Sequence, residues 1–520
     1  MAIISTYRQF QKVFMAYEHF KVNPKLWEMT KSSCYRAPVP ELPKEFKAEY
    51  VKALKHKGYD DTFIEDTLFD YDYIKKKCRH FLEKDAGLNL VTHFMREVEY
   101  CWAQHDERNL DLVIYRPEVV LFVVLLAKIS GFVTYKDYAR YWAENYLWLW
   151  FLVPNMPRPK HLITEETVRV ICTLGPEEEM EHLFKQFFAE VKFKLQDLIC
   201  NKKDASGYID TTTGKFIKFK PTKGFDGQEM RASSREGEES RKKKHHIVTL
   251  FNCDDRQVDD FRMVDKKNQE TQAVIKMLDS VIGTNDNCIY ISDSLNAKKD
   301  FFEYCDKRGF HYLMQFKKNA GNKKLFKQCE EKFSQEYLSS LNIDEIFCKK
   351  GEDLSHGRLE KVKLTMLSVK HFDEEVLPST RVLSIIKYEK TCQRIVKGAT
   401  ESKSRPSHKV HYFVFTLPFS KESFEQAVHS ISVCWFYEQH HNTIDTVLLQ
   451  DQQCVTKKNS ASFTAATNKM TFSVLSFLRQ YMSKDRKKPV TFKDVIRMQQ
   501  TPLLTFQYLI EYFMTPEATE

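Results

Sequence analysis

Hydrophobic and polar positions follow helical spacing in the first part of the chain. Residues Val119–Ile129 are nearly all apolar and are predicted to form a central helix. The aromatic-rich stretch Tyr135–Trp150 lies in the same domain, and Thr164 or Thr167 is a candidate N-cap for another helix. These segments predict an all-helical domain over residues 91–195.

After residue 200 the pattern changes to short apolar runs separated by helical stretches. Residues Ile289–Ser292, Ala297–Lys307 and Tyr312–Phe316 predict a strand, a helix and a parallel strand. Four further strands are predicted at His246–Phe251, Lys361–Val369, Arg381–Tyr388 and His411–Thr416. Helices are predicted after a capping box at Ser423–Gln426 and over Thr471–Met482.

These patterns predict an α/β part with a β-rich stretch, preceded by a helical domain. The N-terminal region has no motif. The predicted parts are an N-terminal helical or irregular region (1–90), a helical domain (91–195), the first part of the core (200–330), the β-rich insertion (335–418), the rest of the core (419–485) and tail helices (486–520).

Composition narrows the protein class only slightly. The net charge is +9, which slightly favours binding to polyanions. Many proteins with such a charge bind no nucleic acid. Thirteen cysteines without a Cys-x-x-Cys pair argue against a disulfide framework and a zinc ribbon. The longest apolar run, Val119–Ala127, is too short to span a bilayer, and the first residues lack a signal-peptide core. A soluble intracellular protein is expected.

Two aspartates are the strongest candidates for chemistry. Asp226 lies in a glycine-flanked segment, and Asp293 ends the apolar run that begins at Cys288. Two converging carboxylates are suitable ligands for Mg²⁺, which prefers oxygen. Helical spacing places Glu438 on the apolar face of the helix after Ser423, so a shared metal ion would give this carboxylate a partner. Trp435, on the same face, is predicted to be a core residue, and base stacking is its alternative role.

Other residues compete for the same roles or are set aside. Asp210 is a rival to Asp226, and Pro221 with the glycines around Asp226 predicts a poor strand. His245 and His246 are adjacent on a predicted strand and therefore point to opposite faces, which argues against a zinc site.

Seven motifs in order resemble those of DDE transposases with a ribonuclease H-like core, specifically the insertion-sequence-four group of the ISAs type and its eukaryotic relatives. The resemblance covers residues 95–480. The motifs are Asp226-Gly-Gln-Glu-Met-Arg-Ala-Ser, His246-Ile-Val-Thr-Leu-Phe, Lys266-Lys-Asn-Gln-Glu, Ile291-Ser-Asp-Ser-Leu-Asn-Ala, Tyr312-Leu-Met-Gln-Phe-Lys-Lys-Asn, His356-Gly-Arg-Leu-Glu and Trp435-Phe-Tyr-Glu-Gln.

This resemblance implies Asp226, Asp293 and Glu438 as the catalytic and metal-binding residues, with Mg²⁺ as cofactor and Mn²⁺ as its substitute. The segment after Glu438 departs from the family pattern, so Asp445 and Asp451 stay open as the third ligand. By family position, DNA contacts fall on Lys317, Lys318 and Arg358, and Arg231 is a further candidate. His356, Glu360, His441 and Asp445 are candidates for supporting roles. The implied fold is a ribonuclease H-like catalytic core with a β-rich insertion after an all-helical domain, and residues 1–90 are a candidate contact with the DNA end.

The implied activity is cut-and-paste transposition by two-metal phosphoryl transfer. The implied partners are transposon-end DNA, target DNA and a second protomer in the synaptic complex, with no membrane. The location would be nuclear in a eukaryote and cytoplasmic otherwise. Three alternatives stay open: a domesticated transposase-derived DNA-binding protein, a metal-dependent nuclease without strand transfer, and a non-enzymatic helical interaction protein.

Overall fold

The computed structural model describes residues 113–185, 206–231, 244–280, 287–394, 406–453 and 459–499, with short internal gaps, and single positions before 113. The chain divides into two compact units. One comprises Met1–Leu174 and Ile496–Glu520, and the other comprises Gly175–Val495. Most of the predicted region 1–90, and the tail after residue 499, lie outside the described residues.

The first unit is helical where it is described. Helix α7 is Pro117–Ile129, α8 is Tyr135–Leu152 and α9 is Glu165–Cys172. Every residue of α7 is buried, which confirms the central helix expected from its apolar run. The side chain of Thr164 caps α9, as predicted, by accepting a hydrogen bond from the Thr167 amide.

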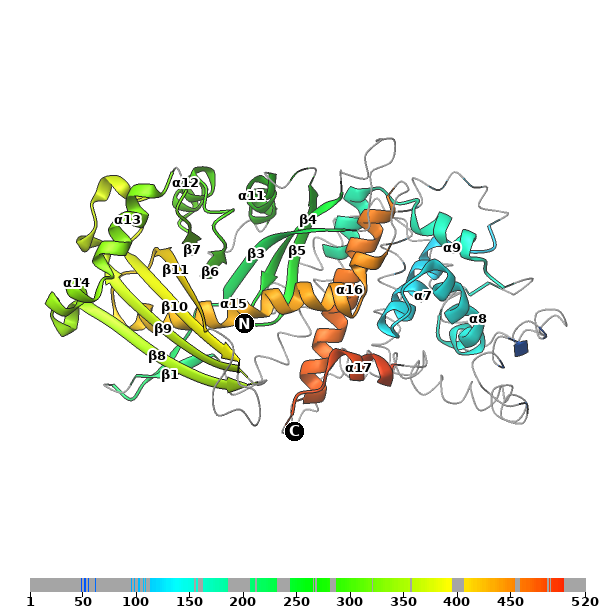
Figure 1. Cartoon of the computed structure of the whole chain (residues 1–520). Helices are drawn as coiled ribbons and strands as arrows, with labels where there is room; N and C mark the ends of the chain where they lie inside the picture. The colour runs from blue at the N-terminus through cyan, green and yellow to red at the C-terminus, as the bar shows by residue number, and fades with distance from the viewer. Residues whose placement is uncertain are drawn as a thin grey trace. The chain divides into compact units, whose positions relative to one another are not determined.

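The second unit is built on a nine-stranded mixed sheet with the order β5-β4-β3-β6-β7-β11-β10-β9-β8 (Figure 1). A separate two-stranded ribbon pairs β1 with β2. The strands are β1 Gly207–Ile209, β2 Phe216–Lys218, β3 Thr222–Glu229, β4 His246–Asn252, β5 Gln257–Val264, β6 Ile289–Ser292, β7 His311–Phe316, β8 Ile346–Ser355, β9 Arg358–Ser368, β10 Ser384–Arg394 and β11 Ser407–Phe415.

Strand directions divide the sheet into two parts. Strands β3, β6 and β7 are parallel neighbours, which confirms the predicted strand–helix–strand unit. All other neighbouring pairs are antiparallel. Because β11 pairs directly with β7, the predicted insertion strands extend the core sheet and form no second sheet.

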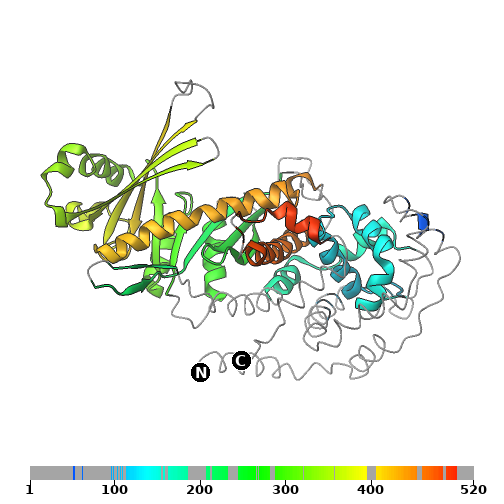
Figure 2. The same ribbon diagram turned by 90° about the horizontal axis from the view of Figure 1, so that it is seen from below.

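Helices cover both faces of this sheet (Figure 1). One face packs under α11 and α12, with Phe225, Tyr290 and Tyr312 in its apolar cluster. The other face packs under α15, a helix of 26 residues that crosses the sheet (Figure 2). The helices of the second unit are α11 Glu270–Ser280, α12 Lys299–Arg308, α13 Lys323–Lys332, α14 Gln335–Ser340, α15 Lys421–Thr446 and α16 Ser460–Ser483, and α17 Phe492–Met498 follows at its boundary.

Two local predictions were wrong. Residues Thr222–Glu229 form an eight-residue strand despite Pro221 and two glycines, because both neighbouring strands pair with this segment. Helix α15 starts one turn before the predicted Ser423. Its N-cap is Ser420, whose side chain accepts a hydrogen bond from the Ser423 amide.

Among the described residues, no helix has both the length and the hydropathy needed to cross a membrane.

Candidate active site

Asp226 and Asp293 occupy matching positions on neighbouring parallel strands. The last printed pair of the β3–β6 ladder joins Gly224 to Ile291, and each aspartate follows two residues later. The continued register therefore sets the two aspartates side by side, on strands about 4.8 Å apart. Side chains alternate between faces, so Asp226 projects from the same face as Gly224, the face that meets Tyr437 of α15.

Helix α15 is fixed directly over this pair. The Tyr437 hydroxyl donates a hydrogen bond to the Asp226 carbonyl oxygen at 3.0 Å. Burial raises the pKa of the Cys434 thiol to about 12, and Glu438, Asp226 and Asp293 each add to this increase. All three carboxylates therefore lie within electrostatic reach of the same thiol, on the α15 side of the sheet.

The pair of aspartates fits a hard divalent cation. Mg²⁺ keeps several waters and is bound through one or two carboxylates. Two carboxylates at matching register supply such ligands. Within the described part of the chain, no three His, Cys, Asp or Glu side chains are close enough together to hold one ion. Glu438 therefore faces the aspartate pair without completing a three-ligand cluster.

Glu438 has an unusual electrostatic setting. Surrounding protein raises the pKa of its carboxyl, while Lys409 and Lys390 lower it. Its carboxylate makes no hydrogen bond or ion pair with another described residue. A raised pKa and the lack of a protein partner are both typical of a carboxylate that binds a cation.

The rival acids have partners of their own. The Gln228 amide donates a hydrogen bond to Asp445 at 2.6 Å, and Asp451 pairs with Arg231 at 3.4 Å. Burial, together with the negative charge of nearby Asp451, raises the pKa of Asp445 to about 6. Because Gln228 is two residues after Asp226, Asp445 lies over the same strand face, one step beyond the aspartate pair.

Asp210 lies at the other end of α15. It accepts a hydrogen bond from the Thr213 hydroxyl at 2.6 Å and pairs with Lys421 at 3.3 Å. Lys421 begins α15, and Glu438 follows 17 residues later, which is about 25 Å at 1.5 Å per residue. The structure thus keeps Asp210 apart from the other acids.

The predicted DNA-binding and supporting residues are dispersed. Lys318 pairs with Glu330 at 3.4 Å, and Glu360 pairs with Lys390 at 2.7 Å. Lys317 is exposed after β7, Arg358 is exposed at the start of β9, and His356 lies outside the described residues. His441 is in van der Waals range of Tyr437, and burial lowers the pKa of its ring to about 3.

The prediction that Trp435 is a core residue was wrong. Its side chain is 55% exposed, although Ile431 and Cys434 pack on the apolar cluster as expected. The apolar cluster under α15 ends before this turn, where the helix passes over polar positions of β10 and β11. Sequence reasoning also missed Lys390 and Lys409, because strand pairing alone places them beside Glu438.

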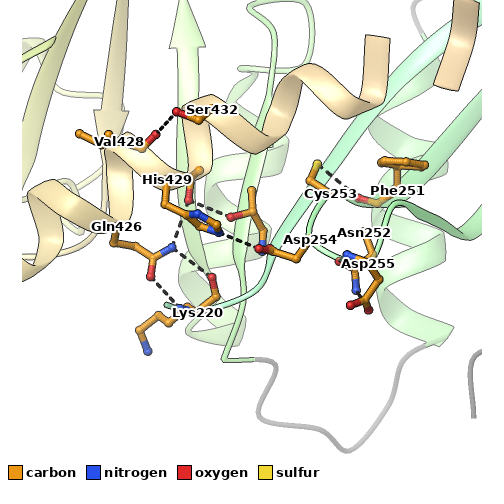
Figure 3. Close-up of polar contacts among 12 residues, drawn as sticks. Lys220, Phe251, Asn252, Cys253, Asp254, Asp255, Gln426, Val428, His429 and Ser432 are labelled. Atoms are coloured by element: carbon orange, nitrogen blue, oxygen red, sulfur yellow. Dashed lines mark hydrogen bonds and ion pairs between the residues drawn. The ribbon is translucent and has the colours of Figure 1, made fainter. Parts of the chain in front are cut away.

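A polar network ties the first turns of α15 to the start of β3 (Figure 3). The Gln426 amide donates to the Lys220 carbonyl at 3.0 Å, and the Lys220 amide donates to the Gln426 side chain at 2.7 Å. His429 pairs with Asp254 at 2.6 Å, and Asp254 also accepts from the Thr222 amide. These contacts set the position of α15 above the aspartate pair.

A buried hydrogen bond between two side chains constrains the other face of β3. His246 Nε2 lies 2.7 Å from Glu270 Oε1, and both side chains are almost completely buried. A Cβ added at Gly227 would overlap both groups. Glycine next to Asp226 is therefore required by close packing.

A buried lysine lies beneath the C-terminal half of α15. Lys469 of α16 is 0% exposed, and its Nζ is 3.4 Å from His440 Nε2. Burial lowers the pKa of Lys469 to about 7, against an opposing effect of Asp445. Above about pH 7 the Lys469 amine is therefore neutral, which suits its buried position.

Lys469→Met is expected to stabilise the protein most below pH 7. The unfolded lysine has a pKa of about 10.4, so above pH 7 the unfolded state binds a proton that the folded state lacks. As the pH rises above 7, the free energy of unfolding of the wild type increases by up to about 1.4 kcal/mol per pH unit because of this lysine. The stability difference between Lys469→Met and the wild type becomes smaller by the same amount. Unfolding midpoints of both proteins between about pH 6 and 9 measure this. An advantage that is constant with pH would contradict it.

Part of this chain is similar to a known protein family. Residues 214–432 match the family model described as a transposase DDE domain. The matched segment contains Asp226 and Asp293 and ends before Glu438.

This chain is similar to a curated relative and to a solved structure. The Escherichia coli (strain K12) protein YbfL is 25% identical over 267 residues, which is 51% of this chain and 66% of that relative. The piggyBac transposase synaptic complex with hairpin DNA has a TM-score of 0.38 and 8% identity, covering 84% of this chain and 86% of that chain. A likeness at this TM-score carries no argument about function.

Proposed function

We propose that this chain is a DNA transposase that cuts transposon ends and joins them to target DNA. The observation that carries the proposal is the matching register of Asp226 and Asp293 within the transposase DDE domain, with Glu438 facing them from α15. The order of β5, β4, β3, β6 and β7, three antiparallel strands followed by two parallel ones, supports a ribonuclease H-like core. The group proposed is the insertion-sequence-four group of the ISAs type.

Asp226, Asp293 and Glu438 would hold two divalent cations, Mg²⁺ or its substitute Mn²⁺. Bound there, such ions activate an attacking oxygen and stabilise the departing one. The protein supplies position. Hydrogen bonding of Tyr437 fixes the backbone of Asp226, and Lys390 and Lys409 favour the ionised form of Glu438. Positioning and charge neutralisation account for most of the rate in phosphoryl transfer.

The proposed partners are DNA and a second protomer. Transposon-end DNA and target DNA are the substrates, and two protomers bring two ends together. Lys317, Lys318, Arg358 and Arg231 are proposed DNA contacts, with His356, Glu360, His441 and Asp445 in support. The location is the nucleus in a eukaryote and the cytoplasm otherwise.

Joining of a precleaved end tests the function. Inverted repeats that flank the coding region, bracketed by a short duplication, supply the end sequence. A labelled duplex ending in this repeat is incubated with the full chain, Mg²⁺ and supercoiled plasmid. We expect label on the plasmid, and loss of joining with a chelator or in Asp293→Ala. Asp210→Ala, which alters the acid at the far end of α15, is the matched control and keeps joining.

Two outcomes would reject the proposal. Metal-dependent nicking of plasmid without any joining would indicate a nuclease. Binding of the end without a metal-dependent reaction would indicate a transposase-derived DNA-binding protein.

A further inference from the structure

Four buried polar side chains are linked on the face of the sheet opposite α15. His246 Nε2 lies 2.7 Å from Glu270 Oε1, at the start of α11. The Asn296 side-chain amide, in the loop after β6, donates to Glu270 Oε2 at 3.4 Å and to the Ser292 hydroxyl oxygen at 3.2 Å. All four side chains are buried. We call His246, Glu270, Asn296 and Ser292 the buried polar network.

One end of this network joins the two strands that carry the aspartates. The Ser292 hydroxyl donates a hydrogen bond to the Phe225 carbonyl oxygen at 2.8 Å. Ser292 directly precedes Asp293, and Phe225 directly precedes Asp226. A single side-chain hydrogen bond therefore links β6 to β3 immediately before both aspartates.

The network also anchors the turn that orients the Asp293 carboxylate. The Leu295 backbone amide donates to Asp293 Oδ1 at 2.9 Å, and the next backbone amide, that of Asn296, donates to the Asp293 carbonyl oxygen at 3.4 Å. The Asn296 side chain is 0% exposed, and its oxygen accepts from the Thr271 hydroxyl at 3.5 Å. Because both ends of the Asn296 amide are bonded, the turn around Asp293 is held at its last residue.

The network fixes Asp226 through its neighbouring glycine. The Gly227 backbone amide donates to Asp226 Oδ1 at 2.8 Å. Glu270 Oε1 and His246 Nε2 approach Gly227 so closely that an added Cβ would overlap both. The backbone donor to each aspartate therefore belongs to a segment that the network holds in place.

Rigid support of this kind affects cation binding. Partners that orient the ligands of a metal typically change its affinity 10- to 100-fold when they are removed. In a buried network each hydrogen bond depends on the others, so losing one member loosens the whole path. The α15 face presents the carboxylates, and the opposite face determines where they point.

We propose that the buried polar network positions the metal ligands: it fixes the separation of Asp226 and Asp293 and the orientation of their carboxylates, and thereby sets the affinity of the site for a divalent cation. This inference rests on the proposed function, because it takes the two aspartates as cation ligands. The four members are positioning residues that act through the backbone beside each aspartate.

Binding of Mn²⁺ alone to the full chain tests the proposal, with free Mn²⁺ measured by electron paramagnetic resonance. Ser292→Ala and Asn296→Ala are each expected to raise the dissociation constant by about 10- to 100-fold. The double variant should bind no more weakly than the weaker single variant, because both substitutions interrupt one path. Ser292→Thr keeps the hydroxyl donor and should retain most of the affinity.

The matched control separates positioning from general stability. Val274→Ala removes a fully buried side chain of α11 from the apolar cluster on the same face, one turn after Glu270. It should lower the unfolding midpoint and leave the Mn²⁺ dissociation constant unchanged. An equal loss of Mn²⁺ affinity in Val274→Ala, wild-type affinity in both network variants, or no Mn²⁺ binding by the wild type would each overturn the proposal.

Failure of this inference can be distinguished from failure of the proposed function. If precleaved ends are joined but the network variants bind Mn²⁺ like the wild type, only the inference fails. If Mn²⁺ affinity depends on the network but no end is joined, only the transposase proposal fails.

Discussion

Asp226→Asn and Asp293→Asn are each expected to lower the rate of end joining by about 10³-fold, in the range of losses seen when a charge-neutralising group is removed from a phosphoryl-transfer site. Asparagine keeps the size of the side chain and removes the charge that a divalent cation requires. The structure places the two aspartates at matching register, so each loss should be equally severe.

The same variants should separate chemistry from folding. In metal-free buffer, neither variant should unfold at a lower temperature than wild type, because each removes one of two neighbouring like charges. Added Mg²⁺ should raise the unfolding midpoint of wild type by binding the folded state, and this increase should be lost in both variants. An active Asp226→Asn protein, or a metal-dependent increase that survives in it, would contradict the assignment.

Glu438→Gln, compared with Asp445→Asn and Asp451→Asn, identifies the third acid. Glu438 lies with both aspartates around the Cys434 thiol, whereas Asp445 is bound by Gln228 and Asp451 by Arg231. We therefore expect the full loss of joining only in Glu438→Gln. Loss in Asp445→Asn with activity kept in Glu438→Gln would transfer the role to Asp445.

Gly227→Ala is expected to destabilise the second unit by about 1–3 kcal/mol, the usual cost of inserting a methyl group into a closely packed site. The added methyl group would overlap His246 Nε2 and Glu270 Oε1, which are 2.7 Å apart. Both side chains are buried, so neither can move away easily. Strand β3 would have to shift, and with it the backbone of Asp226. Shifts in the denaturant midpoint of the full chain measure the change.

Gly351→Ala is the matched control, since this glycine of β8 has no heavy atom within 4 Å of an added Cβ. Its stability should stay within about 0.5 kcal/mol of wild type. In a Glu270→Ala background, Gly227→Ala should cost much less, because one of the two overlapping groups is gone. Full additivity of the two substitutions would show that overlap with Glu270 is not the cause.

The sequence predicted the strand–helix–strand unit, because it depends on local apolar runs, and it identified Asp226 and Asp293 as candidate site residues. It did not predict the register between β3 and β6, which depends on strand pairing between distant segments. It also favoured a poor strand at β3, since glycine and proline lower strand propensity. Pairing on both sides and the close packing at Gly227 outweigh that propensity.

Glu438 and Trp435 illustrate the limit of helical spacing. Both follow the apolar face of α15, and spacing alone predicted a buried tryptophan. The sheet below α15 is apolar under Ala427 and polar under Trp435, and only the pairing of β10 with β11 determines where that change occurs. The sequence did not predict that Lys390 and Lys409 lie near Glu438, because their position also depends on the pairing of β10 with β11.

The length of α15 gives small movements a large effect. Glu425 is bound to Lys349 of β8 at 2.7 Å, and Glu438 follows 13 residues later, about 20 Å along an uninterrupted rod. A tilt of about five degrees around the anchored turns would carry Glu438 by roughly 2 Å. A displacement of about 1 Å can lower a reaction rate 10²-fold. A shift of the edge strand β8 would therefore be expected to change the turnover rate.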